Sequence, residues 1–114
     1  MADCIFCKIA ARQIPSNVVL DTDDAFAFRD INPQAPHHIL IVPKRHIEKL
    51  ADLKDADAGL MGRLFLAATG LAHDLGLDED GYRIVVNNGE QAGQSVWHIH
   101  LHLLSGRPFR WPPG

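Results

Sequence analysis

The chain contains 114 residues, of which 46% are hydrophobic and 22% charged, and its formal net charge is -3. This length and composition predict one globular domain over residues 1–114 with a single hydrophobic core. The slightly acidic balance gives no basic surface for nucleic acid or for an anionic membrane, so we expect neither as a partner.

The N-terminal segment reads M-A-D-C-I-F-C-K and has no apolar stretch of signal-peptide length. The nearly apolar runs further along are far shorter than the roughly 20 residues that cross a bilayer. Only two cysteines occur, Cys4 and Cys7, which is too few for a disulfide framework and fits a reducing compartment. We therefore predict a cytoplasmic protein.

Three strands are predicted in the first half of the chain. Residues 18–20 precede a polar turn, and residues 25–29 (A-F-A-F-R) place two phenylalanines on one face. Residues 30–36 contain two prolines and predict a loop, because proline cannot donate to a strand ladder. The run H-H-I-L-I-V-P, residues 37–43, is apolar on both faces and predicts a central strand.

A long helix is predicted next, because either Asp55 or Asp57 can cap its first turn. Glycine readily adopts the left-handed conformation that ends helices, so the helix should stop near Gly76. The buried stripe consists of apolar residues at helical spacing: Leu60, Leu64, Ala68, Leu71 and Leu75, widened by Met61, Phe65 and Ala72.

Two further strands are predicted over residues 82–87 and 97–104, separated by the loop N-G-E-Q-A-G-Q-S. Short turns between most strands, with one substantial helix, indicate an α+β domain on an antiparallel sheet.

The last strand reads W-H-I-H-L-H-L-L and places His98, His100 and His102 at every second position. Residues two apart on a strand share a face, so the three imidazoles should point the same way while Ile99 and Leu101 point to the other side. The first and third histidines would lie ~13 Å apart, which argues against one metal ion held by all three.

Two interpretations of the histidine face remain. It is either an exposed polar face or a reaction centre, since histidine serves as nucleophile and general acid or base near neutral pH. Upstream, Gly93, Gln94 and Ser95 offer backbone N–H groups, an amide and a hydroxyl, a combination that suits a phosphate. Three neighbouring histidines directly after such a loop favour the reaction centre.

The chain resembles the histidine triad (HIT) superfamily, and within it the histidine triad nucleotide-binding (Hint) branch. The diadenosine-polyphosphate hydrolase branch shares the triad but lacks the W-P-P-G ending. The resemblance is carried by D-C-I-F-C-K-I (3–9), F-R-D-I-N-P-Q-A-P-H-H (28–38), I-V-P-K-R-H-I (41–47), Y-R-I-V-V-N (82–87), G-Q-S-V-W-H-I-H-L-H-L-L (93–104) and W-P-P-G (111–114).

The resemblance implies a five-stranded antiparallel sheet with one long helix and a short N-terminal helix, continuous across a homodimer. It also implies that the P–N bond of adenosine or guanosine phosphoramidates is hydrolysed through a covalent nucleotidyl-histidine. Two alternatives stay open: a dinucleoside polyphosphate hydrolase, and a nucleotide- or zinc-binding interaction module with little catalysis.

Site residues follow from the same resemblance. His100 would be the nucleophile, aligned by the backbone carbonyl of His98, and His102 would contact the α-phosphate. His38 would complete the polar network, and Ser95 would protonate or position the leaving amine. No cofactor is expected for this chemistry.

The nucleotide would be held by residues from several segments. Asp30 would accept hydrogen bonds from the ribose, although an aspartate here also suits a simple turn. The apolar residues around the purine also fit a core assignment. The implied set comprises Phe6, Ile9, Phe28 and Ile31 around the base, and Asn87, Gly93, Ser95, Val96, His100 and His102 at the phosphate.

The Cys4-x-x-Cys7 pair has three interpretations. A redox couple is expected to follow a strand and open a helix, and only three residues precede this pair. Inert thiols are the second possibility. The third is a structural zinc ion, which the resemblance implies. Many bacterial members of the superfamily bind zinc through two cysteines, a histidine after the central strand and the first triad histidine, and the last two correspond here to His46 and His98.

Overall fold

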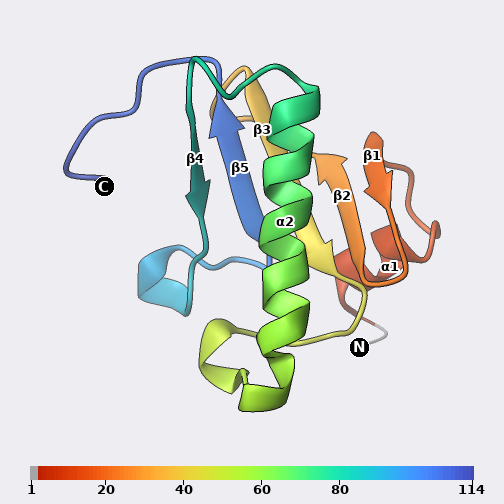
Figure 1. Cartoon of the computed structure of the whole chain (residues 1–114). Helices are drawn as coiled ribbons and strands as arrows, with labels where there is room; N and C mark the ends of the chain where they lie inside the picture. The colour runs from red at the N-terminus through yellow and green to blue at the C-terminus, as the bar shows by residue number, and fades with distance from the viewer. Residues whose placement is uncertain (1–2) are drawn as a thin grey trace.

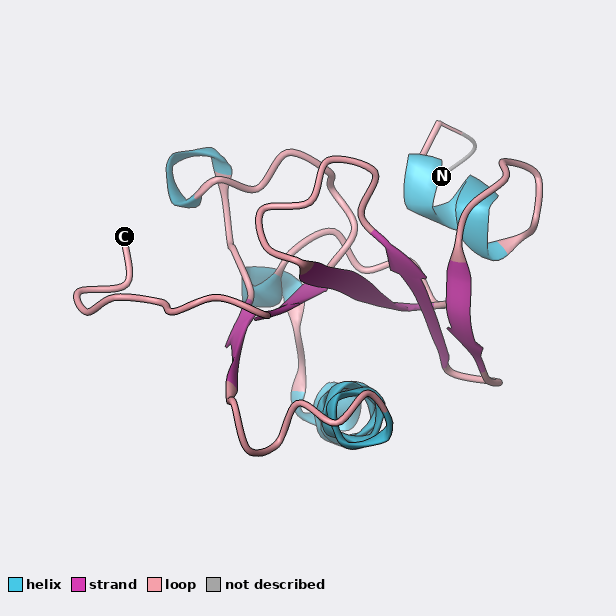
Figure 2. Ribbon diagram, turned by 90° about the horizontal axis from the view of Figure 1, so that it is seen from above, coloured by secondary structure: helices cyan, strands magenta, loops and turns pink. Residues whose placement is uncertain are grey.

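The computed structural model describes residues 3–114 as an antiparallel five-stranded sheet with the strand order β1-β2-β3-β5-β4. A long helix lies along one face of the sheet, and a short N-terminal helix lies beyond the other (Figures 1 and 2). The predicted α+β architecture is confirmed. The elements are α1 (Ile5–Ala10), β1 (Val18–Asp21), β2 (Ala25–Arg29), β3 (His37–Pro43), α2 (Ala58–Asp74), β4 (Tyr82–Val85) and β5 (Leu101–Ser105).

The helix α2 covers the sheet with most of the apolar stripe that the sequence predicts. The prediction is wrong for Phe65, which is 41% exposed, and for Leu75, which is 37% exposed because it lies beyond the last residue of the helix. Leu64 and Ala68 of α2 are fully buried, as are Ile41 of β3 and Leu101 of β5. The main core consists of Ala25, Ala27, Ile39, Ile41, Leu64, Ala68, Leu71, Ala72, Leu77, Leu101 and Leu103. The helix ends where expected, with Gly76 at φ +74°.

The opposite face of the sheet carries a second core that is built around aromatic side chains. Because residues alternate along β2, its alanines face α2 while Phe26 and Phe28 face α1. Phe6 and Ile9 of α1 complete this core together with Leu40 and Val42 of β3. The Phe6 ring centroid lies 5.0 Å from that of His100, so this catalytic candidate is on the α1 side of the sheet.

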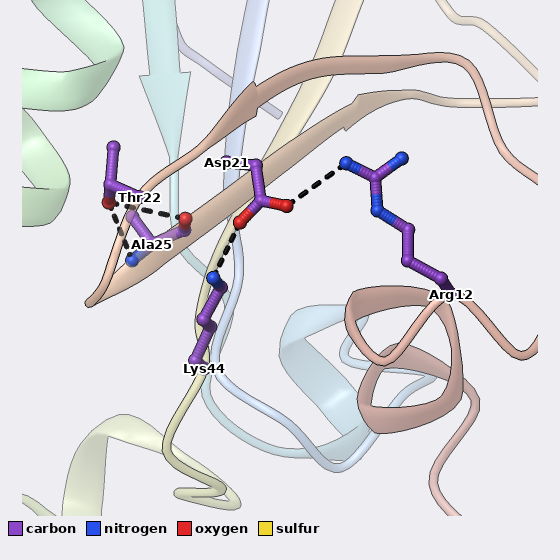
Figure 3. Close-up of polar contacts among 5 residues, drawn as sticks. All are labelled: Arg12, Asp21, Thr22, Ala25 and Lys44. Atoms are coloured by element: carbon purple, nitrogen blue, oxygen red, sulfur yellow. Dashed lines mark hydrogen bonds and ion pairs between the residues drawn. The ribbon is translucent and has the colours of Figure 1, made fainter.

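Ion pairs attach the end of α1 to the sheet (Figure 3). Asp21 at the end of β1 accepts hydrogen bonds from Lys44, just beyond β3, and from Arg12 at 3.0 Å. The guanidinium of Arg12 also lies 5.1 Å from the centroid of the Phe26 ring. Arg12 itself has φ +63°, a left-handed conformation that ends the short helix.

Strand β5 begins later than the sequence predicts, at Leu101 instead of Trp97. The pairing with β3 runs from His37 opposite Ser105 to Ile41 opposite Leu101 and stops there. Beyond that point the partner strand ends at Pro43, which has no N–H, and Ile99 donates its N–H to the carbonyl of Ile47 instead. Strand β4 likewise ends at Val85, two residues before the predicted end.

The start of α2 also differs from the prediction. A 3-10 turn over Asp55–Asp57 precedes the helix, and the Asp57 carboxylate accepts from the N–H of Lys54 at 2.9 Å and pairs with Arg45. Asp57 therefore closes the preceding turn and makes no capping bond to α2. Within residues 3–114, no helix combines the length and apolarity needed to cross a bilayer.

Candidate active site and metal centre

The predicted histidines lie side by side on the α1 face of the sheet. His98 and His100 precede β5, while His102 lies within it and His38 is on the neighbouring strand β3. The ring centroids of His100 and His102 are 4.8 Å apart, and those of His102 and His38 are 5.2 Å apart. The shared face is confirmed although only one of the three triad histidines is in the strand. Ile99, Leu101 and Leu103 are buried on the other side.

His100 is held in one tautomer by the backbone. Its Nδ1–H donates to the carbonyl of His98 at 2.8 Å, so the Nε2 atom of neutral His100 carries a free lone pair. The ring is 6% exposed, and burial lowers its pKa, the His98 hydrogen bond opposing this shift. The result is a neutral imidazole with its unprotonated nitrogen fixed in direction.

A backbone N–H also sets the tautomers of His38 and His102. The N–H of Gln34 donates to Nδ1 of His38 at 3.0 Å, so the proton of neutral His38 resides on Nε2. That Nε2–H then donates to Nδ1 of His102 at 2.9 Å, which leaves the His102 proton on its own Nε2. Burial, followed by the neighbouring His100 and His38, lowers the pKa of His102 to about 4. His102 is thus a neutral donor beside the His100 ring.

Asp30 lies at the start of the loop after β2. One of its oxygens accepts from the N–H of Asn32 at 2.8 Å, so the turn suggested by the sequence is present. The other oxygen lies 3.5 Å from Nε2 of His38. This carboxylate therefore borders the histidines and opposes the effect of burial, which lowers the pKa of His38.

Three of the four apolar residues predicted around a purine lie together, and the fourth does not. Phe6, Ile9 and Phe28 are buried in the second core, with the Phe6 ring centroid 5.0 Å from that of His100. Ile31 is 99% exposed and forms no part of this cluster. The core interpretation therefore holds for the first three side chains, and Phe6 among them also lies beside the nucleophile candidate.

The glycine-containing loop before the triad is braced by Gln94. This side chain is 4% exposed; its oxygen accepts from Gly89 N–H at 2.9 Å, and its amide donates to the carbonyls of Glu48 and Val96 at 2.7 and 3.1 Å. Gly93 has φ +100°. A Cβ on Gly93 would lie 3.8 Å from the Asn87 amide nitrogen, so these two predicted phosphate contacts are neighbours, and Ser95 is exposed just beyond them.

Cys4, Cys7, His46 and His98 form a four-residue cluster whose ligand atoms all lie within 4.8 Å of one another. Nδ1 of His98 is 3.2 Å from Nδ1 of His46 and 3.4 Å from Sγ of Cys4. Zn–N and Zn–S bonds of about 2.1 and 2.3 Å give tetrahedral N···N and N···S edges of ~3.4 and ~3.6 Å, and the observed distances lie within about 0.2 Å of these. The donor set and spacing therefore fit a tetrahedral zinc ion.

The outer contacts of His98 also fit a metal ligand. Its Nε2–H donates to the carbonyl of Pro43 at 2.7 Å, which leaves the Nδ1 lone pair directed at the cysteines and His46. Metal-bound histidines usually donate their second N–H in this way. By contrast, the group Asp30, His38 and His102 does not fit a metal, because Nδ1 of His38 accepts an N–H and its Nε2 therefore carries the proton.

Three contributors to this geometry escape sequence reasoning. They are the Gln34 N–H, the Pro43 carbonyl and the buried amide of Gln94. The first two are backbone groups and leave no trace in residue identity. Gln94 belongs to the G-Q-S segment, and the sequence predicted that its amide would help to bind phosphate. In the structure the amide instead braces the loop through backbone hydrogen bonds.

Comparison with known proteins gives consistent matches along the chain. A family model described as the HIT domain matches residues 11–109. A 14 kDa zinc-binding protein of Brassica juncea is 48% identical over 98% of this chain and 100% of its own length. The crystal structure of a HIT family hydrolase from Legionella pneumophila Philadelphia 1 has a TM-score of 0.96 at 51% identity, covering 98% of this chain and 100% of that one. A histidine triad nucleotide-binding protein from Candida albicans has a TM-score of 0.82 at 36% identity, covering 96% and 83%.

Proposed function

This chain belongs to the HIT domain family, and on that premise we propose that it is a purine nucleoside phosphoramidase. The observation that carries the proposal is the hydrogen bond from His100 Nδ1–H to the His98 carbonyl, which reserves Nε2 for attack. A neutral, buried and oriented imidazole is the form of histidine that acts as a nucleophile.

In the first step, Nε2 of His100 attacks the α-phosphorus of the nucleoside phosphoramidate. A P–N bond forms to the histidine while the original P–N bond breaks, and the amine leaves with a proton from the Ser95 hydroxyl. The Nε2–H of His102 donates to an α-phosphate oxygen and stabilises the charge that develops there. In the second step, water attacks the phosphorus, releases the nucleoside monophosphate and restores both side chains.

The nucleotide lies between the loops that surround the histidines. Asp30 accepts from the ribose hydroxyls, and Phe6, Ile9 and Phe28 form an apolar floor that supports the base, while the exposed side chain of Ile31 contacts the base from the solvent side. Asn87, Gly93 and the backbone of Val96 bind phosphate oxygens. The base contacts are apolar, so adenine and guanine are both accepted.

We also propose that Cys4, Cys7, His46 and His98 hold a structural zinc ion, as the spacing and donor set allow. When bound, zinc supplies a cross-link between α1, the segment after β3 and the triad, and takes no part in the chemical steps. The site needs reduced thiols, which suits the predicted cytoplasmic location.

Homodimerisation is part of the proposal. Strand β4 lies at one edge of the sheet, and an edge strand can extend the sheet through a second copy. Sedimentation is expected to give a dimer, and a monomer at every concentration tested would remove this part of the proposal.

The decisive experiment is mass spectrometry of protein mixed briefly with adenosine 5′-phosphoramidate. The wild type should carry one added nucleotide on His100, and His100→Ala should carry none and lose at least ~1,000-fold in kcat. Wild-type turnover by His100→Ala would contradict the assignment.

Two substrates separate the proposal from its alternatives. A phosphoramidase should turn over adenosine 5′-phosphoramidate much faster than a diadenosine polyphosphate, and the reverse order would indicate the polyphosphate hydrolase. Unchanged nucleotide affinity in His100→Ala, with negligible turnover in both proteins, would instead indicate a binding module.

A further inference from the structure

A surface pocket of about 340 Å³ lies between the glycine-containing loop and the N-terminal segment. Its lining includes Ser95 and Val96 of the loop, Asp3, Ile5 and Glu48 on the other sides, and Cys4 and His46 of the cysteine–histidine cluster. The volume is at the small end of the roughly 300–1,000 Å³ typical of ligand pockets, and so suits a small group better than a whole nucleotide.

Two features of the lining give the pocket a chemical preference. Asp3 and Glu48 contribute carboxylates, and within residues 3–114 no lysine or arginine lines the pocket. Ile5 and Trp97, which are 46% and 45% exposed, contribute apolar and aromatic surface. An indole face and carboxylates together attract an organic cation with an apolar stem.

The same buried amide holds both walls of the pocket. Gln94 donates to the backbone carbonyl of Glu48 on one wall and to that of Val96 on the other. Gln94 is 4% exposed, and its amide oxygen also accepts a hydrogen bond, so all of its polar groups are paired. A fully paired buried amide is rigid, and it therefore fixes the distance between the Glu48 side of the pocket and the loop that carries Ser95. The pocket is therefore part of the folded framework.

We propose that this pocket binds the amine portion of the phosphoramidate and selects amines that carry a second positive charge. The inference rests on the phosphoramidase function proposed above, in which Ser95 meets the departing nitrogen. Because Ser95 also lines the pocket, a substituent on that nitrogen extends toward Glu48, Asp3 and Trp97. The pocket thereby determines specificity for the leaving group, while the triad acts on the nucleotide.

The test compares adenosine 5′-phosphoramidates of two amines that differ only at the far end. The first is 1,5-diaminopentane, whose free end is an ammonium, and the second is n-hexylamine, whose end is a methyl group. For the zinc-loaded wild type at low salt, kcat/KM should be roughly three- to tenfold higher for the diamine derivative. Added salt should reduce this ratio, because the contact is partly exposed.

Glu48→Gln provides the matched variant, since it keeps the shape of the side chain and removes its charge. It should bring the diamine-to-hexylamine ratio of kcat/KM close to one. Glu79→Gln, which makes the same charge change at an exposed position outside the pocket, should keep the wild-type ratio.

Equal kcat/KM for the two amines in the wild type, or a ratio that Glu48→Gln does not change, would overturn the pocket assignment while the phosphoramidase function stands. No turnover of either derivative, nor of the unsubstituted phosphoramidate, would overturn the proposed function and this inference together.

Discussion

At the scale of single residues, backbone groups decide what each histidine can do. The His98 carbonyl fixes His100, the Gln34 N–H fixes His38 and through it His102, and the Pro43 carbonyl fixes His98. Four chemically identical side chains therefore present different groups. His100 keeps a free Nε2 lone pair and His102 an Nε2–H, His38 links the Gln34 N–H to His102, and His98 directs its Nδ1 lone pair at the cysteines and His46. Histidine suits each role because its two nitrogens are distinct.

Burial of His102 should make the protein sensitive to acid. In the unfolded chain this group protonates near its ordinary pKa of 6.5, but in the folded protein the pKa is lowered to about 4. Between these values the unfolded state binds more protons, so stability is full above pH 6.5 and falls as the pH drops toward 4. Thermal unfolding of His102→Gln across this range should show a shallower fall than the wild type.

His73→Gln is the control for this acid dependence, because His73 is exposed and its contact with Asp78 raises its pKa. The stability that this pair contributes is constant below pH 6.5 and is lost only at higher pH. The stability of His73→Gln should therefore fall with the same slope as that of the wild type between pH 6.5 and 4. Equal slopes for His102→Gln and the wild type would show that the folded protein does not keep His102 neutral.

At the scale of elements, the sequence predicts β2, β3 and α2 closely because their patterns arise from burial within each element. The W-H-I-H-L-H-L-L pattern predicts eight strand residues, but pairing stops at Leu101 because the partner strand ends at Pro43. The triad residues and their common face follow from the sequence. Their tautomers do not, because backbone groups of distant segments set them.

Arg12, just after α1, allows the cost of a strained backbone to be separated from the benefit of side-chain contacts. Arg12 has φ +63°, where glycine is at ease and other residues are strained by ~1 kcal/mol or more. Arg12→Ala loses the contacts with Asp21 and Phe26 and keeps the strain, whereas Arg12→Gly loses the contacts and relieves it. Urea unfolding should therefore rank the wild type above Arg12→Gly, and Arg12→Gly above Arg12→Ala by about 1 kcal/mol. An alanine variant as stable as the glycine variant would mean that the φ value carries no cost.

The turn after β5 should tolerate only glycine. Gly106 has φ +98°, and a Cβ there would lie 2.7 Å from Cβ of Pro36 in the loop before β3. Gly106→Ala should therefore lower the free energy of unfolding by ~2 kcal/mol or more. Gly62→Ala is the control, because Gly62 lies inside α2 with open space around it, and alanine should stabilise the helix by ~0.5–1 kcal/mol. Changes of the same sign in both variants would contradict this explanation.

At the scale of the whole molecule, the four-residue cluster joins segments that are distant in the chain. Cys4 and Cys7 belong to the α1 segment, His46 follows β3, and His98 leads into β5. The second core already holds α1 against β2 and β3, but α1 has only six residues and contributes few buried side chains. A metal ion would hold this short helix to the segment before β5 that carries the nucleophile candidate, so that α1 and the histidine cluster would stabilise one another.

Removal of zinc should therefore lower stability across the molecule. We expect about one zinc per chain in protein purified without chelators, measured by atomic emission. With zinc a thousandfold above its Kd, the ion contributes ~4 kcal/mol, so chelation should lower Tm by more than about 10 °C. His46→Gln removes one ligand and leaves all three triad histidines in the sequence. The variant should lose the zinc, and its Tm should equal that of the chelated wild type. His73→Gln, which changes a histidine outside the cluster, should keep the zinc and lose as much Tm on chelation as the wild type does. Metal-free wild-type protein, or a Tm unchanged by chelation, would show that Cys4 and Cys7 are ordinary partly buried thiols.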